Sequence, residues 1–281
     1  MMKPTKETVK VTAHQDGEAR SLEAELEVDA PVAAVWKALT DGEELANWFP
    51  FEARVTPGVG GSVWLSWGGE GEECTIEAWE PERHLRTMWP GAHAADPDKP
   101  VVVDYTLEGK GGSTTLRLVH TGFSSDEEWD DEFDAHRRGW SFELRSLQHY
   151  LHHHNGKRRH MVKAQTPLTV SHEEAWARVT GPNGLAHQGT LEGLAEGDRY
   201  AITTASGDRL AGEVRVASPP TDLATTVEQL DFSLLRLSIE RYGYPEGPIH
   251  VQLWLAAYGM DAAERRALEG RWQGLLDNLF P

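Results

Sequence analysis

Hydrophobic and polar residues alternate along much of the first 120 positions of the chain. From Ser21 to Asp29, small and aliphatic residues alternate with acidic ones, which predicts a strand with one buried and one solvent-facing side. Pro31 then opens a predicted helix that runs to Leu39, and a second short helix is expected over 43–48. Six more strand-like runs follow between turns rich in Gly and Pro: 51–56, 62–67, 72–79, 84–89, 101–107 and 114–121. Consecutive short strands joined by tight turns predict an antiparallel meander.

The stretch from Ser125 to His154 is predicted to be one long amphipathic helix. It begins with Ser-Asp-Glu-Glu, a capping box that places acid at the positive end of the helix dipole. Apolar residues then recur at spacings of three, four and seven in one stripe: Trp129, Phe133, Trp140, Leu144, Leu147 and Leu151. A helix this long needs a large apolar surface to lie against. The sequence therefore predicts an α+β fold, in which a curved antiparallel sheet wraps on a long C-terminal helix.

The same order of elements recurs in weaker form after Lys157. A strand is predicted over 161–170, a helix with a capping box over 171–180, and a final helix over 261–279. Five further strands are expected between them, near 198–204, 209–217, 223–229, 233–241 and 249–257.

Short motifs support an internal repeat. Trp36-x-x-Leu39-Thr40 returns as Trp176-x-x-Val179-Thr180, and Trp140 corresponds to Trp272. We therefore predict two domains of one fold in tandem, over 19–156 and 157–281, the second a divergent copy that packs on the first. A flexible tail is expected over 1–18, with some extended structure at 9–12.

The charge and the single cysteine exclude several classes of protein. A net charge of −18 repels phosphate backbones and anionic lipid, so neither nucleic acid nor an anionic membrane is expected as a partner. With Cys74 alone, neither an intrachain disulfide nor a Cys-based zinc site can form. No apolar run approaches the ~20 residues that span a bilayer, and residues 1–20 lack the apolar core of a signal peptide. We expect a cytoplasmic protein without a membrane span.

Three motifs in the first half resemble a known family. Ala30-Pro-Val-Ala-Ala-Val-Trp-Lys-Ala-Leu-Thr-Asp-Gly-Glu-Glu-Leu-Ala-Asn-Trp-Phe49, His120-Thr-Gly-Phe123 and Arg138-Gly-Trp140 are similar to the START-like, or SRPBCC, superfamily, in the branch named after the activator of the 90-kDa heat-shock-protein ATPase. The resemblance covers residues 21–151 and implies a helix-grip fold with an apolar cavity between sheet and long helix. Relatives use this cavity for hydrophobic ligands, a few are cyclases or hydrolases, and the namesake acts on a chaperone through protein contacts. The second half has no counterpart of Asn47-Trp-Phe49 or of His-x-Gly-Phe.

The first domain is unusually rich in aromatic residues, and these are the candidate ligand contacts. Any one of them is more commonly a core residue, whereas wide rings around a grip cavity fit a flat apolar ligand. His120 shares strand parity with Leu116 and Leu118, so it should face inward, where it could orient a ligand or be held by a neighbour. Gly139, inside the long helix, suggests a close approach of backbone or ligand. The candidate ligand-binding residues are Trp48, Phe49, Trp64, Trp67, Trp79, Trp89, Tyr105, His120, Phe133 and Trp140.

Other reactive residue types are interpreted as structural. His149 and His153 stand one turn apart but have no carboxylate in that turn, so we predict no metal site. Cys74 lies mid-strand between acidic and polar neighbours that would blunt a thiol. There is no phosphate-binding loop and no nucleophile elbow, so neither a cofactor nor a catalytic residue is assigned.

The sequence thus predicts binding of a small hydrophobic or aromatic ligand in the first domain. Two alternatives stay open: a protein-interaction module that regulates a chaperone, and a cyclase or hydrolase that uses His120 as a proton carrier. Enzymatic activity is the weaker expectation.

Overall fold

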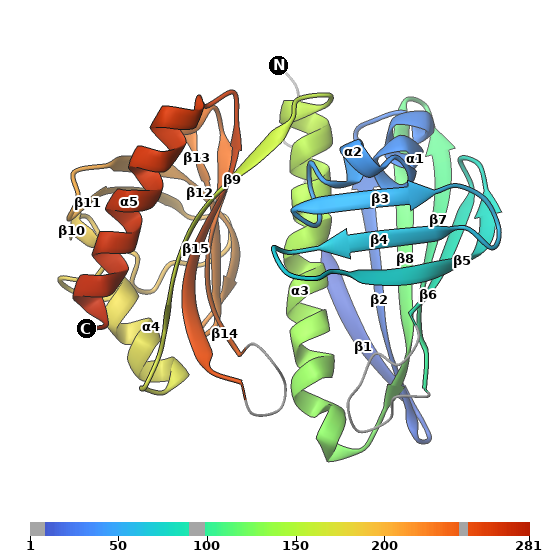
Figure 1. The fold of residues 1–281 in the computed structure, drawn as a ribbon, viewed down its shortest axis with the longest axis horizontal. Helices are drawn as coiled ribbons and strands as arrows, with labels where there is room; N and C mark the ends of the chain where they lie inside the picture. The colour runs from blue at the N-terminus through green and yellow to red at the C-terminus, as the bar shows by residue number, and fades with distance from the viewer. Residues whose placement is uncertain (1–8, 90–98, 242–246) are drawn as a thin grey trace. The chain divides into compact units, whose positions relative to one another are not determined.

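The computed structural model describes residues 9–89, 99–241 and 247–281. The chain divides into two compact units, residues 1–156 and 157–281 (Figure 1). Each unit consists of one antiparallel sheet and one long helix that follows the last strand of that sheet.

The sheet of the first unit has eight strands in the order β1-β2-β8-β7-β6-β5-β4-β3. Their bounds are β1 Lys10–Asp16, β2 Ala19–Val28, β3 Glu52–Thr56, β4 Ser62–Ser66, β5 Glu72–Glu80, β6 His84–Trp89, β7 Val101–Lys110 and β8 Ser113–Ser124. All neighbours pair antiparallel, so β3 to β8 form the expected meander. The last strand of the meander, β8, pairs with β2.

The sequence predicted only part of the first strand, as some extended structure at 9–12. We expected a flexible tail over 1–18, but β1 forms a hairpin with β2 in which Lys10 lies opposite Glu25 and Asp16 opposite Ala19. Gly17, at φ +59°, makes the tight turn between them. This edge strand is polar and mostly exposed, so it lacks the apolar alternation that marks a half-buried strand. Residues 1–8 lie outside the described part of the chain.

Three helices complete the first unit: α1 Val32–Thr40, α2 Gly42–Leu45 and α3 Asp130–His149. The expected capping box at Ser125 is wrong, because the Ser125 backbone N–H donates to Glu18 O and the chain there is still tied to the hairpin. A 3₁₀ turn over Glu127–Trp129 intervenes, and α3 begins at Asp130 with three acidic residues in its first turn. A π-helical turn over Tyr150–His154 ends the long helix.

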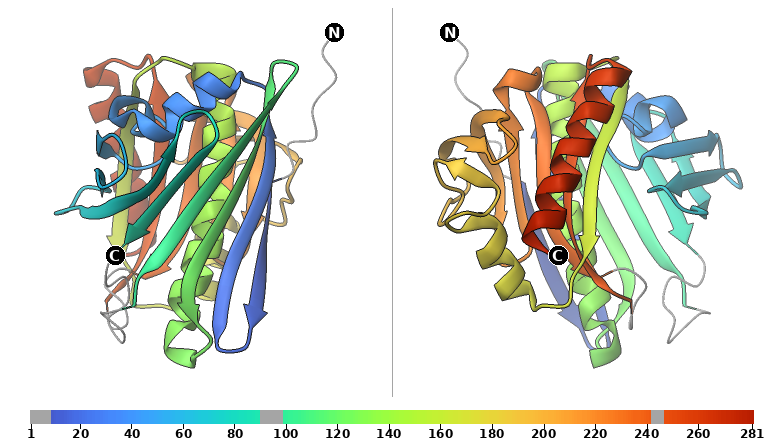
Figure 2. Two further views of the ribbon diagram at one scale, coloured as in Figure 1. Left: turned by 90° about the vertical axis from the view of Figure 1, so that its right-hand side faces the viewer. Right: turned by 60° about the vertical axis from the view of Figure 1, so that its left-hand side comes forward.

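The core of the first unit follows strand parity. The inward residues of β2 and β8 meet the stripe of α3, and all have at most 3% of their surface exposed: Leu22, Ala24, Leu26, Val28, Leu116, Leu118, His120, Leu144 and Leu147. Figure 2 shows α3 lying along this face of the sheet.

The second unit repeats this plan. Its sheet has the order β10-β11-β12-β13-β14-β15-β9. The bounds are β9 Arg159–Pro167, α4 His172–Thr180, β10 Ala186–Gln188, β11 Arg199–Thr204, β12 Arg209–Ser218, β13 Asp222–Val227, β14 Ser233–Arg241, β15 Ile249–Tyr258 and α5 Ala262–Leu279. β9 beside β15 corresponds to β2 beside β8, and β10 to β15 correspond to β3 to β8. The protein is therefore a tandem of two helix-grip units.

Local contacts also repeat between the two units. The Thr40 hydroxyl donates to Trp36 O at 2.7 Å, and the Thr180 hydroxyl donates to Trp176 O at 2.8 Å. The second unit passes from α4 to β10 without a counterpart of α2, which explains its missing Asn-Trp-Phe motif. The three-residue strand β10 was not predicted, because it is too short to show a period. No described helix in either unit is long and apolar enough to cross a membrane.

Candidate functional site

The first unit encloses a small cavity between the middle of its sheet and α3. Its volume is about 30 Å³, enough for a water-sized group but well below the 150 Å³ that admits benzene. The cavity is lined by Leu39, Leu45, Phe49, Val63, Leu65, Cys74, Leu85, Thr87, Trp89, Val103, Tyr105 and Trp140. Side chains therefore fill most of the space between sheet and helix.

A stack of three aromatic rings closes one side of this cavity. Phe49 lies between Trp48, with centroids 5.2 Å apart at 21°, and Trp140, with centroids 5.4 Å apart at 22°. Tyr105 meets Trp140 edge-on at 6.2 Å, and Trp67 meets Phe49 edge-on at 5.4 Å. Offset stacks and edge contacts are the favoured geometries of aromatic pairs. Trp48 is fully buried, whereas Phe49 is only half-buried at the rim.

The Asn47-Trp48-Phe49 segment is fixed by hydrogen bonds on both sides of the stack. The Trp48 indole N–H donates to Ala38 O at 2.9 Å, and its own carbonyl accepts from the Ser146 hydroxyl at 2.8 Å. Asn47 Nδ2 donates to the Tyr150 hydroxyl at 3.2 Å. These bonds tie the end of α2 to both α1 and α3, so the ring of Phe49 projects from a rigid base.

Trp140 is held in turn by His120. The Trp140 indole N–H donates to His120 Nδ1 at 3.0 Å. Because Nδ1 accepts this bond, neutral His120 carries its proton on Nε2, and that N–H is buried without an acceptor among the described residues. The His120 ring also lies 5.0 Å from the ring of His136.

Burial disfavours the charged form of both imidazoles. Burial, with a smaller contribution from neighbouring His136, lowers the pKa of His120 well below its ordinary value. Burial also lowers the pKa of His136, although a hydrogen bond to the Glu132 carbonyl opposes this. The expectation that His120 faces inward is correct, and its Nδ1 accepts the Trp140 indole N–H.

The sheet side of the cavity carries a few neutral polar groups. Burial raises the pKa of the Cys74 thiol to about 11, and the thiol donates to Val63 O at 3.3 Å. Burial also raises the pKa of Tyr105 far above its ordinary value, with smaller contributions from Cys74 and Glu143. The Trp89 indole N–H is buried without an acceptor among the described residues.

Residues 29–152 match the family model described as Activator of Hsp90 ATPase homolog 1-like protein, AHSA1. The N-terminal unit is an AHSA1-like domain. The match ends before the second unit begins. No curated protein matches the chain.

Matches to solved structures cover about half or most of this chain. The crystal structure of protein MLL2253 from Mesorhizobium loti is 27% identical and covers 47% of this chain and 97% of that chain, with a TM-score of 0.43. The di-domain ARO/CYC BexL from the BE-7585A biosynthetic pathway is 16% identical and covers 92% of this chain and 97% of that chain, with a TM-score of 0.41. DynU16, from the dynemicin biosynthetic locus, is 18% identical and covers 92% and 96%, with a TM-score of 0.40.

Four of the ten candidate residues of the AHSA1-like domain line its cavity: Phe49, Trp89, Tyr105 and Trp140. Three more candidates do not line the cavity but pack against Phe49 or Trp140, which do: Trp48, Trp67 and His120.

The remaining three candidates do not line the cavity. Trp64 has the opposite parity to Val63 and Leu65 on β4, and the Arg54 guanidinium lies 4.1 Å from its ring centroid. Trp79 packs edge-on against Trp36 of α1 at 5.2 Å. Phe133 packs on Phe123 at 5.1 Å. Strand parity turns Trp64 away from the cavity, and Phe133 lies two turns before Trp140 on α3, about 10 Å along the helix.

The glycine in the His120-Thr-Gly-Phe123 motif has a steric role, whereas Gly139 does not. Gly122 adopts φ +104°, and a Cβ there would lie 2.4 Å from Pro100 O. A Cβ on Gly139 would meet nothing within 4 Å. The idea that Gly139 permits a close approach is therefore wrong for the described residues.

Other polar residues of the AHSA1-like domain lie on the outer face of the sheet or at the end of α3. Arg86 pairs with Glu77 and Asp104 at 2.8 and 2.5 Å. The rings of His149 and His153 lie 4.6 Å apart at the π-helical turn. Within the described ranges, no group of three or more His, Cys, Asp or Glu side chains could hold a metal ion.

Sequence reasoning missed most of the aliphatic and small polar wall. Leu39, Val63, Thr87 and Val103 line the cavity but resemble any other core residue in sequence. Parity on adjacent strands was the available signal, because Cys74, Thr87 and Val103 all face inward.

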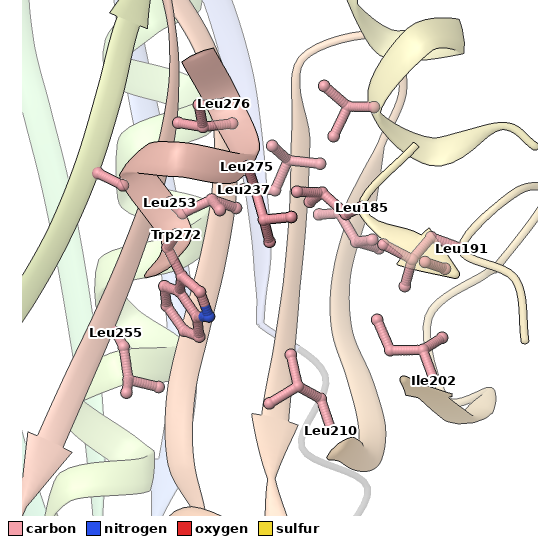
Figure 3. Close-up of a cluster of buried hydrophobic side chains, with 14 of the residues drawn as sticks. Leu185, Leu191, Ile202, Leu210, Leu237, Leu253, Leu255, Trp272, Leu275 and Leu276 are labelled. Carbon is pink, nitrogen blue, oxygen red and sulfur yellow. The ribbon is translucent and has the colours of Figure 1, made fainter. Parts of the chain in front are cut away.

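The second unit has a cavity of similar size, about 30 Å³, under its own long helix. Figure 3 shows Trp272, Leu275 and Leu276 of α5 beside Leu237 and Leu253, with other core leucines across the space. The Tyr200 hydroxyl at this wall donates to Thr226 O at 2.9 Å, so it is already satisfied. The two units thus share a place for the cavity but differ in its polar groups.

Proposed function

We propose that the AHSA1-like domain binds a small hydrophobic or aromatic ligand between its sheet and α3, in the cavity beside Trp140. The observation that carries this proposal is the position of Phe49. Its half-buried ring stacks on the face of Trp140 at the cavity wall, as a flat ligand would stack there.

The cavity volume sets the condition for binding. At about 30 Å³ it cannot receive an aromatic ring unless a side chain moves. Phe49 is the candidate, because it lies at the rim while Tyr105 and Trp140 are 7% and 6% exposed. Moving a phenyl ring out of contact costs about 1–3 kcal/mol, which a bound aromatic ring offsets by burying similar area against Trp140.

Naphthalene is a suitable probe because it is flat, apolar and uncharged. Titration of the full chain, followed by two-dimensional NMR of the tryptophan indole N–H groups, should shift the signal of Trp140. Phe49→Ala should bind naphthalene more tightly, since no ring must be displaced. Val103→Phe should abolish binding by filling the cavity from the sheet side. Trp64→Ala, on the outer face, is the matched control and should bind as the wild type does.

Binding in Phe49→Ala but not in the wild type would show that the substitution had created the site, and the proposal would fail. Native mass spectrometry of the gently purified chain gives an independent reading. An added mass that is lost on denaturation would supply the natural ligand, and its identity would name the chemistry.

The geometry of His120 does not favour proton transfer in this cavity. Its Nδ1 lone pair accepts from Trp140 and its Nε2 is protonated, so the neutral ring has no free basic nitrogen. We therefore assign His120 a positioning role and no catalytic one.

The family description favours a second candidate function, activation of an Hsp90 ATPase through protein contacts. The outer face of β2 presents Glu23, Glu25 and Glu27, and residues 1–156 contain 29 acidic and 14 basic side chains. Such a surface complements a basic partner. Stimulation of Hsp90 ATP hydrolysis by the wild type, lost when the three glutamates are changed to lysine, would support this function. The absence of stimulation at low ionic strength would reject it.

A further inference from the structure

The cavity of the AHSA1-like domain contains hydrogen-bond donors that lack acceptors. The Trp89 indole N–H is buried and has no acceptor in the described ranges. The hydroxyl of Tyr105, which is 7% exposed on the neighbouring strand, makes no hydrogen bond to a described residue but is not among the fully buried unsatisfied atoms. Because a buried donor without a partner is costly, the Trp89 N–H requires an explanation.

Trp89 and Tyr105 start from well-separated backbone positions on the sheet. Tyr105 pairs with Leu85 across β6 and β7, whereas Trp89 lies four residues further along β6 and pairs with Val101. At about 3.3 Å per residue, the two positions are roughly 13 Å apart along the sheet. Thr87 and Val103 line the wall between them.

No charge is available in this cavity to bind an ionic ligand. None of the described residues that line it is charged. Burial keeps the Cys74 thiol and the Tyr105 hydroxyl protonated by raising their pKa values. Nearby carboxylates are unfavourable for an anion, since Glu143 contributes to the raised pKa of Tyr105 and Glu73 to that of Cys74. A carboxylate ligand would therefore lose its hydration without gaining a cation.

We propose that the ligand is an uncharged aromatic molecule with a hydrogen-bond acceptor, such as a carbonyl or ether oxygen, that accepts from the Trp89 indole N–H. This inference rests on the proposed function of the same site and specifies the class of ligand. The aromatic body stacks on Trp140, and the acceptor lies toward the end of β6. A second acceptor at the other end would meet the Tyr105 hydroxyl.

Three naphthalenes of nearly equal size test this class. 2-Acetylnaphthalene carries a neutral acceptor, 2-ethylnaphthalene lacks one, and 2-naphthoate carries a charge at pH 7. For the full chain, calorimetric titration should give a dissociation constant about fivefold lower for the ketone than for the hydrocarbon, the ratio that one neutral hydrogen bond supplies. 2-Naphthoate should bind more weakly than both.

Trp89→Phe keeps a ring at the wall and removes the donor. It should bind 2-ethylnaphthalene as the wild type does and lose the preference for the ketone. Tyr105→Phe removes the other donor and should leave most of the preference in place. Trp64→Phe makes the same chemical change on the outer face and should alter nothing. Circular dichroism of each variant checks that it is folded.

The outcomes separate this inference from the proposed function. If the wild type binds ketone and hydrocarbon equally, or binds 2-naphthoate best, the acceptor class is wrong although the cavity binds ligands. The same holds if Trp89→Phe weakens ketone and hydrocarbon alike, because Trp89 then acts only by packing. If none of the three compounds binds, both the proposed function and this inference are wrong.

Discussion

Replacing His120 by asparagine removes one buried imidazole from the AHSA1-like domain. The variant therefore measures how much this group contributes to the loss of stability in acid. Asparagine Oδ1 can accept the Trp140 indole N–H in place of Nδ1, so the orientation of Trp140 is retained. The substitution removes a group that titrates, while the hydrogen bond on which Trp140 depends stays in place.

The sign of the effect follows from the lowered pKa of His120. In the unfolded chain a histidine has a pKa of about 6.5, whereas in the folded domain burial lowers it well below that value. Below pH 6.5 the unfolded state therefore binds more protons than the folded state, and the free energy of unfolding falls as the pH falls. Each unit by which the folded-state pKa lies below the unfolded value costs about 1.4 kcal/mol of stability once the pH is below both values. At pH 8 the contribution is absent.

Urea unfolding at pH 8 and pH 5, followed by tryptophan fluorescence, measures this difference. Eight of the eleven tryptophans lie in residues 1–156, so the signal reports mainly on the AHSA1-like domain. On going from pH 8 to pH 5, His120→Asn should lose less of its free energy of unfolding than the wild type.

Two further variants complete the experiment. His136→Asn should reduce the acid loss in the same direction, because burial also lowers the pKa of His136. The exposed His152 of the same domain provides the control, and His152→Asn shows how much of the change any histidine substitution produces. Equal losses in the wild type and His120→Asn would refute the claim that His120 is held neutral in the fold.

Three further predictions concern packing and reactivity. Trp140→Ala should lower the free energy of unfolding by about 3–5 kcal/mol in urea titration, because it empties a buried site; a loss below 1 kcal/mol would contradict that packing. Gly139→Ala should raise stability by about 1 kcal/mol in the same assay, since its Cβ meets no atom, while Gly122→Ala should lower it because its Cβ would strike Pro100 O. Cys74 should react slowly with Ellman's reagent at pH 8 and at the rate of a free thiol in urea, because burial raises its pKa to about 11; fast reaction of the folded protein would show the thiol to be accessible.

Some residues of the candidate site could be predicted from the sequence pattern, whereas others could be placed only by the tertiary packing. Phe49, Trp89, Tyr105 and Trp140 were predicted from aromatic density and do line the cavity. Trp64 looked equivalent in sequence, yet parity on β4 turns it away from the cavity. The cavity is smaller than a flat aromatic ligand requires, since the rings that suggested a ligand site also fill most of the space.

The sequence by itself determined the order of the elements and their duplication. Alternation marked the strands from β2 to β8, and matched Trp and Thr positions revealed the second unit, because these signals arise from local geometry and from burial on one face. The polar edge strand β1 and the late start of α3 came from tertiary pairing, as backbone hydrogen bonds to distant residues override local propensity. The Trp140–His120 bond and the unsatisfied Trp89 donor were likewise decided by the tertiary structure alone. They depend on how residues far apart in sequence meet across a sheet and a helix, which no local pattern encodes.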